Sequence, residues 1–495
     1  MSDYILRASN ICKSFSGVRA LKNVSIEIKK GEIHCLAGEN GCGKSTLINI
    51  ISGVYTMDSG TVELHGKPYK KITPVEAITA GVQVIFQDFA VFPNLTVKEN
   101  ISLSSMISSK DKIVKWSKIK DIAQKAINLI DVSIDLNKEV KDISVADKQL
   151  VAICRALIND AKLLIMDEPT TALTKKEVKS LFNTVLQLRD QGLSILFVSH
   201  KLDEVFEICD RYTILRNGEN VISDDTKSLD NDSFAYYMTG RKFENEPYRV
   251  KIKDQHPLLE VRDLQLEKAF SNVSFTLYPG EIIGLAGLLG SGRNEVALSL
   301  FGLQTPDAGE IYIHGEKKKF RSVTDAINCG IGYVPEDRLT EGVFMERSIG
   351  DNIIVSKLGR LANKIGVLNK KQMQTDIDRI TEQLKIKTDN QDNAVQTLSG
   401  GNQQRVVLGK WIARDMEILI LNGPTVGVDI GSKYDIHQLL KDLAEEGRSV
   451  IIISDDLPEL LSLTNRIFVM NKGTIETELL TEQISEQELA GYIGA

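Results

Sequence analysis

The amino-acid sequence repeats itself over the length of a whole domain. The segment GEIHCLAGENGCGKSTLINIISG at 31–53 returns as GEIIGLAGLLGSGRNEVALSLFG at 280–302. Later, LLIMDEPT at 163–170 returns as ILILNGPT at 418–425, and VSHKLDE at 198–204 returns as ISDDLPE at 453–459. The repeats of solenoid proteins have periods of about 20–50 residues, so two copies of this length predict a tandem of complete domains.

The segment between the two copies has a composition of its own. Residues 240–257, GRKFENEPYRVKIKDQHP, are polar and charged and include Pro247 and Pro257. Such a stretch is typical of a linker. We therefore predict a first domain over 1–242, a linker over 243–257 and a second domain over 258–495.

Each copy shows the same order of predicted elements. Short β-type runs open it, then a strand, a glycine-rich loop and a helix follow, and a helix-rich insertion covers about 97–142 or 348–395. Apolar runs such as KLLIMD and SILFVSH then alternate with helical patterns. Strands that alternate with helices predict an α/β fold with a mostly parallel sheet covered on both faces.

The charge and the cysteines exclude several classes of protein. A net charge of −7 does not favour a nucleic-acid partner, which would select a basic surface. The six cysteines form no CxxC pair, so we expect reduced thiols in a cytosolic compartment. The amino-terminal residues lack the pattern of a signal peptide, and no apolar run approaches the about 18–20 residues of a membrane span. If the protein works at a membrane, we expect it to dock there on partners.

The first glycine-rich loop has the pattern of a phosphate site. GENGCGKST fits G-x-x-x-x-G-K-[ST], with a predicted strand before it and a predicted helix after it. The glycines allow a tight turn that points backbone N–H groups inward, and the helix contributes its positive end. Lys44 can reach the β- and γ-phosphates, and Ser45 can coordinate Mg²⁺. The predicted nucleotide-binding residues of this loop are Gly38, Glu39, Asn40, Gly41, Cys42, Gly43, Lys44, Ser45 and Thr46.

Two carboxylates end the apolar run LLIMDE. We expect Asp167 to hold the Mg²⁺ shell and Glu168 to orient and deprotonate an attacking water. The alternative is a solvated acidic turn before Pro169.

With these motifs the whole chain resembles an ATP-binding-cassette protein that carries both cassettes on one polypeptide. The resemblance implies two tandem P-loop domains, each with a mostly parallel sheet core, an antiparallel β subdomain and a helical subdomain. It also assigns three roles. Gln87 in VIFQD would sense Mg²⁺ and the γ-phosphate, His200 in FVSHKLDE would contact the γ-phosphate, and Phe15 in KSFSG would stack on adenine. The alternatives are a polar loop residue, a structural histidine and a half-buried phenylalanine.

The second copy contains LSGGNQQR at 398–405, which closely matches the signature of this family. Ser399, Gly400 and Gly401 would form an anion site at the start of a helix. In the family, the signature of one cassette completes the nucleotide site of the other. The resemblance therefore implies one complete composite site for ATP and Mg²⁺, with Ser399–Gly401 closing the first-half site.

The other composite site lacks most of its functional groups. Arg293 and Asn294 replace the lysine and the Mg²⁺-binding hydroxyl, and Asn422 and Gly423 replace the two carboxylates. Glu336 stands in place of Gln87, and Asp455 in place of His200. The first-half signature reads ISVADKQ at 143–149, with Val145 and Ala146 in place of its glycines.

Asp147 adds a charge to this weakened signature. We predict that Ser144 caps a helix there, because S-x-x-D is a helix-start pattern. The carboxylate of Asp147 would then stand where the signature meets a γ-phosphate. Like charges about 4 Å apart cost roughly 4 kcal/mol at an effective dielectric constant near 20. We infer that this second site does not hydrolyse ATP at a useful rate.

GRNE, VPEDR, TLSGGNQQ and TVGVDIGSK in the second half resemble the tandem-cassette ATPases of bacterial monosaccharide importers of the ribose, galactose and xylose types. The resemblance implies an ATPase at the cytoplasmic face of the cell membrane. Its partners would be integral membrane permease subunits that are fed by an extracytoplasmic solute-binding protein. Asn422 and Gly423 depart from this pattern, which normally keeps Asp-Glu there, and ISVADKQ is weaker than the usual first-half signature.

Two other functions remain open at this point. One is a soluble tandem-cassette ATPase that acts on ribosomes or nucleic acid, although the acidic chain without CxxC pairs does not favour it. The other is a regulatory protein that binds ATP without hydrolysing it.

A further hypothesis concerns Cys42, whose thiol would have a lowered pKa beside Lys44 and a helix N-terminus. The alternative is a small residue that fits the turn.

Overall fold

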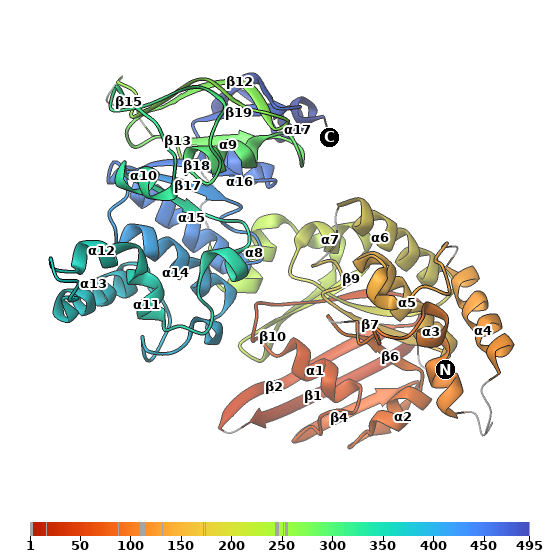
Figure 1. Ribbon diagram of the computed structural model, residues 1–495. Coiled ribbons are helices and arrows are strands. Elements are labelled where there is room, and N and C mark those ends of the chain that lie inside the picture. The colour runs from red at the N-terminus through yellow and green to blue at the C-terminus, as the bar shows by residue number, and fades with distance from the viewer. Residues whose placement is uncertain are drawn as a thin grey trace. The chain divides into compact units, whose positions relative to one another are not determined.

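The computed structural model describes residues 3–494 except 16, 88, 109–114, 131, 172, 174, 243–246, 251 and 253–255. The chain forms two compact units, Met1–Phe243 and Glu244–Ala495. Figure 1 shows the first unit in red to yellow and the second in green to blue. In the described part of the chain, no helix has the length and apolar character needed to cross a membrane.

The first unit contains two sheets. Four strands form an antiparallel sheet in the order β2-β1-β4-β5. Six strands form the larger sheet in the order β10-β9-β3-β8-β7-β6, which is parallel except for the pairing of β9 with β10. The strands are β1 (Tyr4–Phe15), β2 (Val18–Lys29), β3 (Ile33–Ala37), β4 (Ser59–Leu64), β5 (Lys67–Tyr69), β6 (Val82–Ile85), β7 (Leu163–Asp167), β8 (Ser194–Val198), β9 (Arg211–Arg216) and β10 (Glu219–Asp225).

The helices of the first unit follow apolar patterns in the sequence. In α4 (Trp116–Leu129), for example, Ile119, Ala123, Ala126 and Ile127 are buried, which is the spacing of one helix face. Helices α3, α4 and α5 pack against one another as a helical subdomain (Figure 1). Besides α4, the helices of this unit are α1 (Lys44–Ile51), α2 (Pro74–Thr79), α3 (Val97–Ser108), α5 (Val145–Ile158), α6 (Lys175–Asp190), α7 (Leu202–Ile208) and α8 (Asn231–Thr239).

The second unit repeats this architecture. Its antiparallel sheet has the order β12-β11-β14-β15, and its larger sheet has the order β16-β17-β18-β13-β19-β20. The strands are β11 (Leu259–Leu266), β12 (Phe270–Leu277), β13 (Ile282–Ala286), β14 (Ala308–Ile313), β15 (Glu316–Lys318), β16 (Ile331–Val334), β17 (Ile418–Asn422), β18 (Ser449–Ile453), β19 (Arg466–Asn471) and β20 (Thr474–Leu480). The α/β prediction is thereby confirmed.

The helices of the second unit include a π-helical turn, Arg338–Gly342, directly after the VPED segment. Such turns are rare and are often found at functional sites. The α-helices are α9 (Arg293–Leu300), α10 (Val323–Asn328), α11 (Ile349–Ile354), α12 (Leu358–Leu361), α13 (Lys370–Gln383), α14 (Gly400–Ile412), α15 (Ile430–Glu445), α16 (Leu457–Leu463) and α17 (Glu486–Ile493).

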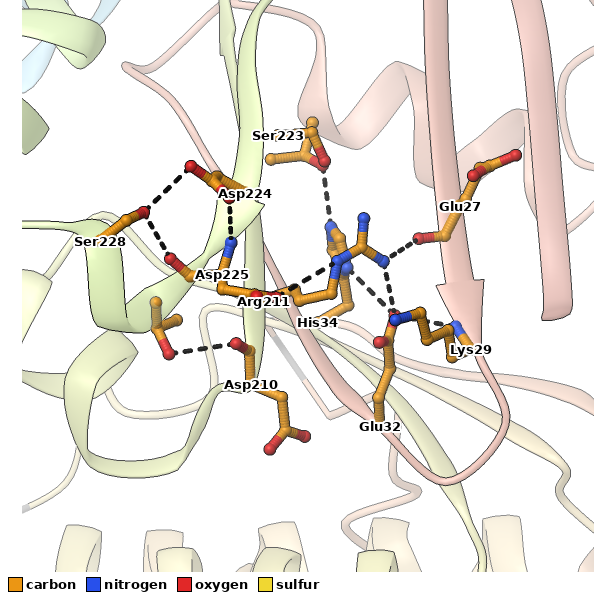
Figure 2. A network of polar contacts seen from close by, with 12 residues as sticks. Glu27, Lys29, Glu32, His34, Asp210, Arg211, Ser223, Asp224, Asp225 and Ser228 are labelled. Atoms are coloured by element: carbon orange, nitrogen blue, oxygen red, sulfur yellow. Dashed lines mark hydrogen bonds and ion pairs between the residues drawn. The ribbon is translucent and has the colours of Figure 1, made fainter. Parts of the chain in front are cut away.

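The central strands are buried along their whole length. Every residue of β3, β8, β13, β17 and β18 is buried, as expected for parallel strands covered on both faces. One buried residue of β3 is polar. His34 lies between Glu32 and Thr213, with Nδ1 3.3 Å from Glu32 Oε1 and Nε2 2.8 Å from Thr213 Oγ1 (Figure 2). Arg211 also approaches Glu32, so this network joins β3 to β9.

Part of the predicted linker belongs to the second unit. The Tyr248 backbone N–H donates to Ser462 O at 2.8 Å, and Asn465 Nδ2 donates to Val250 O at 2.9 Å. These contacts connect residues 248–250 to the segment 462–465 of the same unit. The rest of the linker prediction falls largely on residues outside the described part of the chain.

Candidate functional site

The phosphate loop of the first unit joins β3 to α1 and depends on glycine. Gly43 precedes the helix with φ of +110°, a backbone conformation that favours glycine. A Cβ atom there would lie 2.6 Å from Leu21 Cδ2 and 2.8 Å from Ala20 O. A side chain at this position would therefore collide with β2. The residue directly before α1 must therefore be glycine.

Lys44 is folded back onto this loop. Its Nζ donates hydrogen bonds to Gly38 O at 2.6 Å and to Glu39 O at 3.1 Å, and the residue is 6% exposed. Ser45 and Asn40 are exposed, whereas Thr46 is half-buried. A buried ammonium group beside the start of a helix fits a phosphate group, because both the charge and the backbone N–H groups attract an anion.

Glu168 and His200 lie in contact at the carboxyl ends of β7 and β8. His200 Nδ1 is 3.2 Å from Glu168 Oε1, and in the tautomer protonated at Nδ1 it donates a hydrogen bond to this carboxylate. That hydrogen bond lowers the pKa of Glu168. The carboxyl group is therefore ionised at neutral pH, as a proton acceptor must be.

The pKa of Asp167 is shifted in the opposite direction to that of Glu168. Burial and the neighbouring charge of Glu168 raise its pKa. The positive charge of Lys44 opposes this rise, so the strand end and the phosphate loop act on each other electrostatically. A divalent cation fits such a position, because it would relieve the repulsion between two adjacent carboxylates.

Gln87 follows a strand of the larger sheet, whereas Phe15 belongs to the antiparallel sheet. Gln87 is exposed and follows β6, so it comes from the same edge of the sheet as Asp167 and His200. Phe15 ends β1 and is 39% exposed. Its ring meets Tyr55 edge-to-face, with 5.2 Å between the centroids, and Lys13 Nζ lies 5.2 Å above it. Tyr55 was not among the predicted residues.

The hypothesis of a lowered pKa at Cys42 is wrong. Cys42 is buried beneath the phosphate loop, and a Cβ atom at Gly38 would lie 2.4 Å from its Sγ. Burial raises the pKa of the thiol and outweighs the attraction of Lys44. The structure therefore supports the alternative, in which Cys42 is a small residue that fills the turn.

The phosphate loop of the second unit binds one of the unit's own side chains. Arg293 is buried, and its Nη2 lies 2.5 Å from Asp455 Oδ1. Its Nη1 donates to Ser454 O at 3.4 Å. In the first unit, by contrast, Lys44 donates to carbonyl groups of its own loop. An aspartate carboxylate thus takes the place at Arg293 that a phosphate would need.

Three of the replaced positions of the second unit line a cavity of about 1030 Å³. Asn294, Glu336 and Asn422, which replace Ser45, Gln87 and Asp167, all line it. Tyr333, Lys410 and Trp411 line it as well. Burial lowers the pKa of Lys410 to about 8. The polar groups that face this cavity include no carboxylate at the position of Asp167.

The signature residues begin α14. Ser399 is exposed, and its Oγ accepts a hydrogen bond from Asn402 Nδ2 at 2.9 Å. A Cβ atom at Gly401 would lie 2.0 Å from Ser432 Oγ, so this glycine is also required by packing within the second unit. In the first unit, the prediction that Ser144 caps a helix is confirmed, because Asp147 N donates to Ser144 Oγ at 3.1 Å.

The ABC transporter family matches two parts of the chain, residues 21–171 and 270–426. The ribose import ATP-binding protein RbsA of Bacillus licheniformis is 38% identical over 487 residues, which are 98% of each chain. The protein of the same name from Clostridium perfringens strain SM101 is 40% identical over 487 residues, 98% of this chain and 97% of its own.

Single cassettes of known structure resemble parts of the chain. An ATP-binding cassette of an ABC transporter, solved in its ADP conformation, shares 28% identity with a TM-score of 0.43. It covers 48% of this chain and 100% of its own. Since the family matches both units and the relatives align along nearly the whole length, the chain belongs to the ABC transporter family as an ATP-binding ATPase subunit with two cassettes.

Proposed function

We propose that this protein hydrolyses ATP to power the import of ribose or a related monosaccharide. The names of the relatives that align along 98% of the chain support this solute class. The partners would be integral membrane permease subunits, which receive the sugar from an extracytoplasmic solute-binding protein. The ATPase would then sit at the cytoplasmic face of the membrane, held there by the permease.

The observation that carries the proposal is the difference between the two phosphate loops. Lys44 donates to loop carbonyl groups, which a phosphate can replace, whereas Arg293 is paired with Asp455. We therefore assign hydrolysis to one competent composite site. From the first half it comprises Phe15, Gly38–Thr46, Gln87, Asp167, Glu168 and His200, and from the second half Ser399, Gly400 and Gly401.

Each residue of the first half has a task in this reaction. Lys44 leaves the loop carbonyls and binds the β- and γ-phosphates. Glu168, ionised because its hydrogen bond with His200 lowers its pKa, accepts a proton from the attacking water. His200 holds this carboxylate in place and faces the γ-phosphate.

Mg²⁺ would be held by Ser45, Gln87 and Asp167. When bound, it would supply positive charge that stabilises the negative charge of the phosphate groups. The raised pKa of Asp167 supports this assignment, because a buried carboxylate beside a second one is stabilised by a cation.

The second composite site does not hydrolyse ATP in this proposal. Asn422 and Gly423 have no carboxylate, so they provide neither the metal ligand that Asp167 offers nor a general base. The loss of a general base typically reduces a rate by about 10²–10⁴-fold. The carboxylate of Asp455 already neutralises Arg293. The second half thus contributes its signature to the site of the first half.

Glu168→Gln tests the assignment of the base. The full-length variant should still bind a fluorescent ATP analogue but should lose ATP turnover by about 10²-fold or more. Unchanged turnover would refute the assignment.

Purification of the tagged full-length protein from its cells tests the transport role. Recovery of integral membrane permease subunits supports import, whereas recovery of ribosomes would contradict it.

A further inference from the structure

A buried carboxylate joins the two loops that carry Glu168 and His200. Glu204 lies in the first turn of α7 and is 6% exposed. Its Oε1 accepts a hydrogen bond from Thr170 Oγ1 at 2.5 Å, and its Oε2 accepts one from Ser199 Oγ at 2.5 Å. Lys201 Nζ lies 3.1 Å from Oε1 and compensates the buried charge.

The two hydroxyl groups belong to the segments that present the reacting side chains. Thr170 follows Glu168 by two residues, and Ser199 directly precedes His200. Glu204 therefore holds the end of β7 and the end of β8 at a fixed separation. Across this separation Glu168 and His200 meet at 3.2 Å.

The hydrogen bonds require an acceptor at both oxygens of Glu204. Ser199 Oγ already accepts a hydrogen bond from Lys201 N at 3.1 Å. Thr170 Oγ1 accepts one from Lys201 Nζ at 3.4 Å. Each hydroxyl has a single hydrogen, and both hydrogens are directed to the carboxylate. A glutamine at this position would turn its NH₂ group, which cannot accept a hydrogen bond, toward one of the two hydroxyl groups, and the hydrogen of that hydroxyl would lose its acceptor.

The second unit contains the same arrangement without the reacting groups. Glu459 accepts hydrogen bonds from Thr425 Oγ1 at 2.7 Å and from Ser454 Oγ at 2.6 Å. Ser454 Oγ likewise accepts from Asp456 N at 3.1 Å, and His437 Nε2 lies 2.9 Å from Glu459 Oε1. The loops that Glu459 joins carry Gly423 and Asp455. The chain thus contains two copies of the same hydrogen-bonded carboxylate, Glu204 and Glu459. The proposed catalytic residues lie only beside Glu204.

We propose that Glu204 is a positioning residue for ATP hydrolysis, which sets the distance between Glu168 and His200 through Thr170 and Ser199. This inference rests on the proposed function of the first-half site. Glu459 performs the structural part of the same task in the second unit. Displacing a reacting group by about 1 Å can reduce a rate by about 10²-fold, so a small change at Glu204 is enough to affect turnover.

The test compares Glu204→Gln with the matched control Glu459→Gln in the full-length protein. Three quantities are measured for each: ATP turnover at saturating ATP, the affinity for a fluorescent ATP analogue, and the midpoint of thermal unfolding. We expect Glu204→Gln to lower kcat at least about tenfold with the nucleotide affinity changed less than about twofold, since the phosphate loop is not altered. Glu459→Gln should lower the unfolding midpoint to a similar extent and leave kcat within about twofold of the wild type.

Thr170→Val and its counterpart Thr425→Val provide a second pair, should the charge-removing variants not fold. Thr170→Val should lower kcat and Thr425→Val should not. Equal losses of kcat in the two halves would overturn the inference, as would a Glu204→Gln variant with unchanged kcat. Glu168→Gln, measured in parallel, separates the two proposals. If Glu168→Gln is inactive while Glu204→Gln is fully active, the positioning role fails and the proposed function stands. If Glu168→Gln remains active, the proposed function itself fails.

Discussion

Glu168 and Gly423 have the same left-handed backbone conformation, with φ of +47° and +58°. Both backbone N–H groups donate to the neighbouring strand, Glu168 N to Val198 O at 3.1 Å and Gly423 N to Ile453 O at 2.7 Å. A residue with a Cβ atom is strained in this region, whereas glycine is not. The first unit therefore has a strained backbone at the position of the proposed base, and the second unit has neither the strain nor the carboxylate.

Glu168→Gly should relieve this strain. We expect the variant to be inactive and to be more stable than Glu168→Ala by about 1 kcal/mol, because alanine keeps the Cβ atom at positive φ. Thermal unfolding of the two variants measures the difference. Gly423→Ala is the reverse change and should destabilise the protein, since its Cβ would also lie 2.7 Å from Val426 Cγ2. An Ala variant as stable as the Gly variant at residue 168 would contradict the strain.

Asp167→Asn should raise the thermal unfolding midpoint at pH 7 in the absence of nucleotide and Mg²⁺. The pKa of Asp167 is raised in the folded protein by burial and by Glu168, so its ionised form destabilises the fold at pH values above its ordinary pKa. Asparagine removes this charge. The gain should disappear in acid, where the wild-type carboxyl group is protonated in both states.

Asn422→Asp is the matched change in the second unit and should lower the midpoint at pH 7. Asn422 is buried, and aspartate would place an ionised group there. A midpoint that rises for Asn422→Asp, or falls for Asp167→Asn, would contradict this electrostatic explanation.

Ser399→Arg should abolish ATP turnover, although it lies in the unit without the proposed base. Ser399 is exposed, so the larger side chain can be accommodated without disturbing the core. In the proposed composite site it would fill the position where the signature meets the γ-phosphate. The control is Ser144→Arg at the equivalent position of the first unit, which loses a helix cap worth about 1 kcal/mol but should retain turnover. Normal turnover of Ser399→Arg would refute the composite site.

His34 should make the protein sensitive to mild acid. Burial lowers the pKa of His34, so the folded state binds fewer protons than the unfolded state, whose histidine titrates near about 6.5. As far as His34 is concerned, the free energy of unfolding is therefore highest above about pH 6.5, and it decreases as the pH falls below this value. Thermal unfolding between pH 8 and about 5 should show a smaller decrease for His34→Gln than for the wild type. A decrease as large in His34→Gln as in the wild type would contradict this explanation.

The local motifs of this protein could be predicted from sequence because each is contiguous and follows a strand. Lys44 comes after β3, and Asp167 and Glu168 end β7, so adjacency in the chain is enough to bring the right groups to one edge of a parallel sheet. The repeat likewise determined that there are two domains of one architecture, because a pattern of strands and helices that recurs in order folds in the same way twice.

The contacts between distant segments were decided by the tertiary structure. Glu204 receives Thr170 from 34 residues away, and Arg293 meets Asp455 across 162 residues. The pKa of Cys42 also depends on the tertiary structure. Its place in the sequence, beside Lys44 and the start of a helix, suggested a lowered pKa, but packing buries the thiol and raises its pKa. Sequence spacing specifies which groups a loop carries. The free energy of a buried charge or thiol depends on every segment that surrounds it, and those segments meet only in the folded chain.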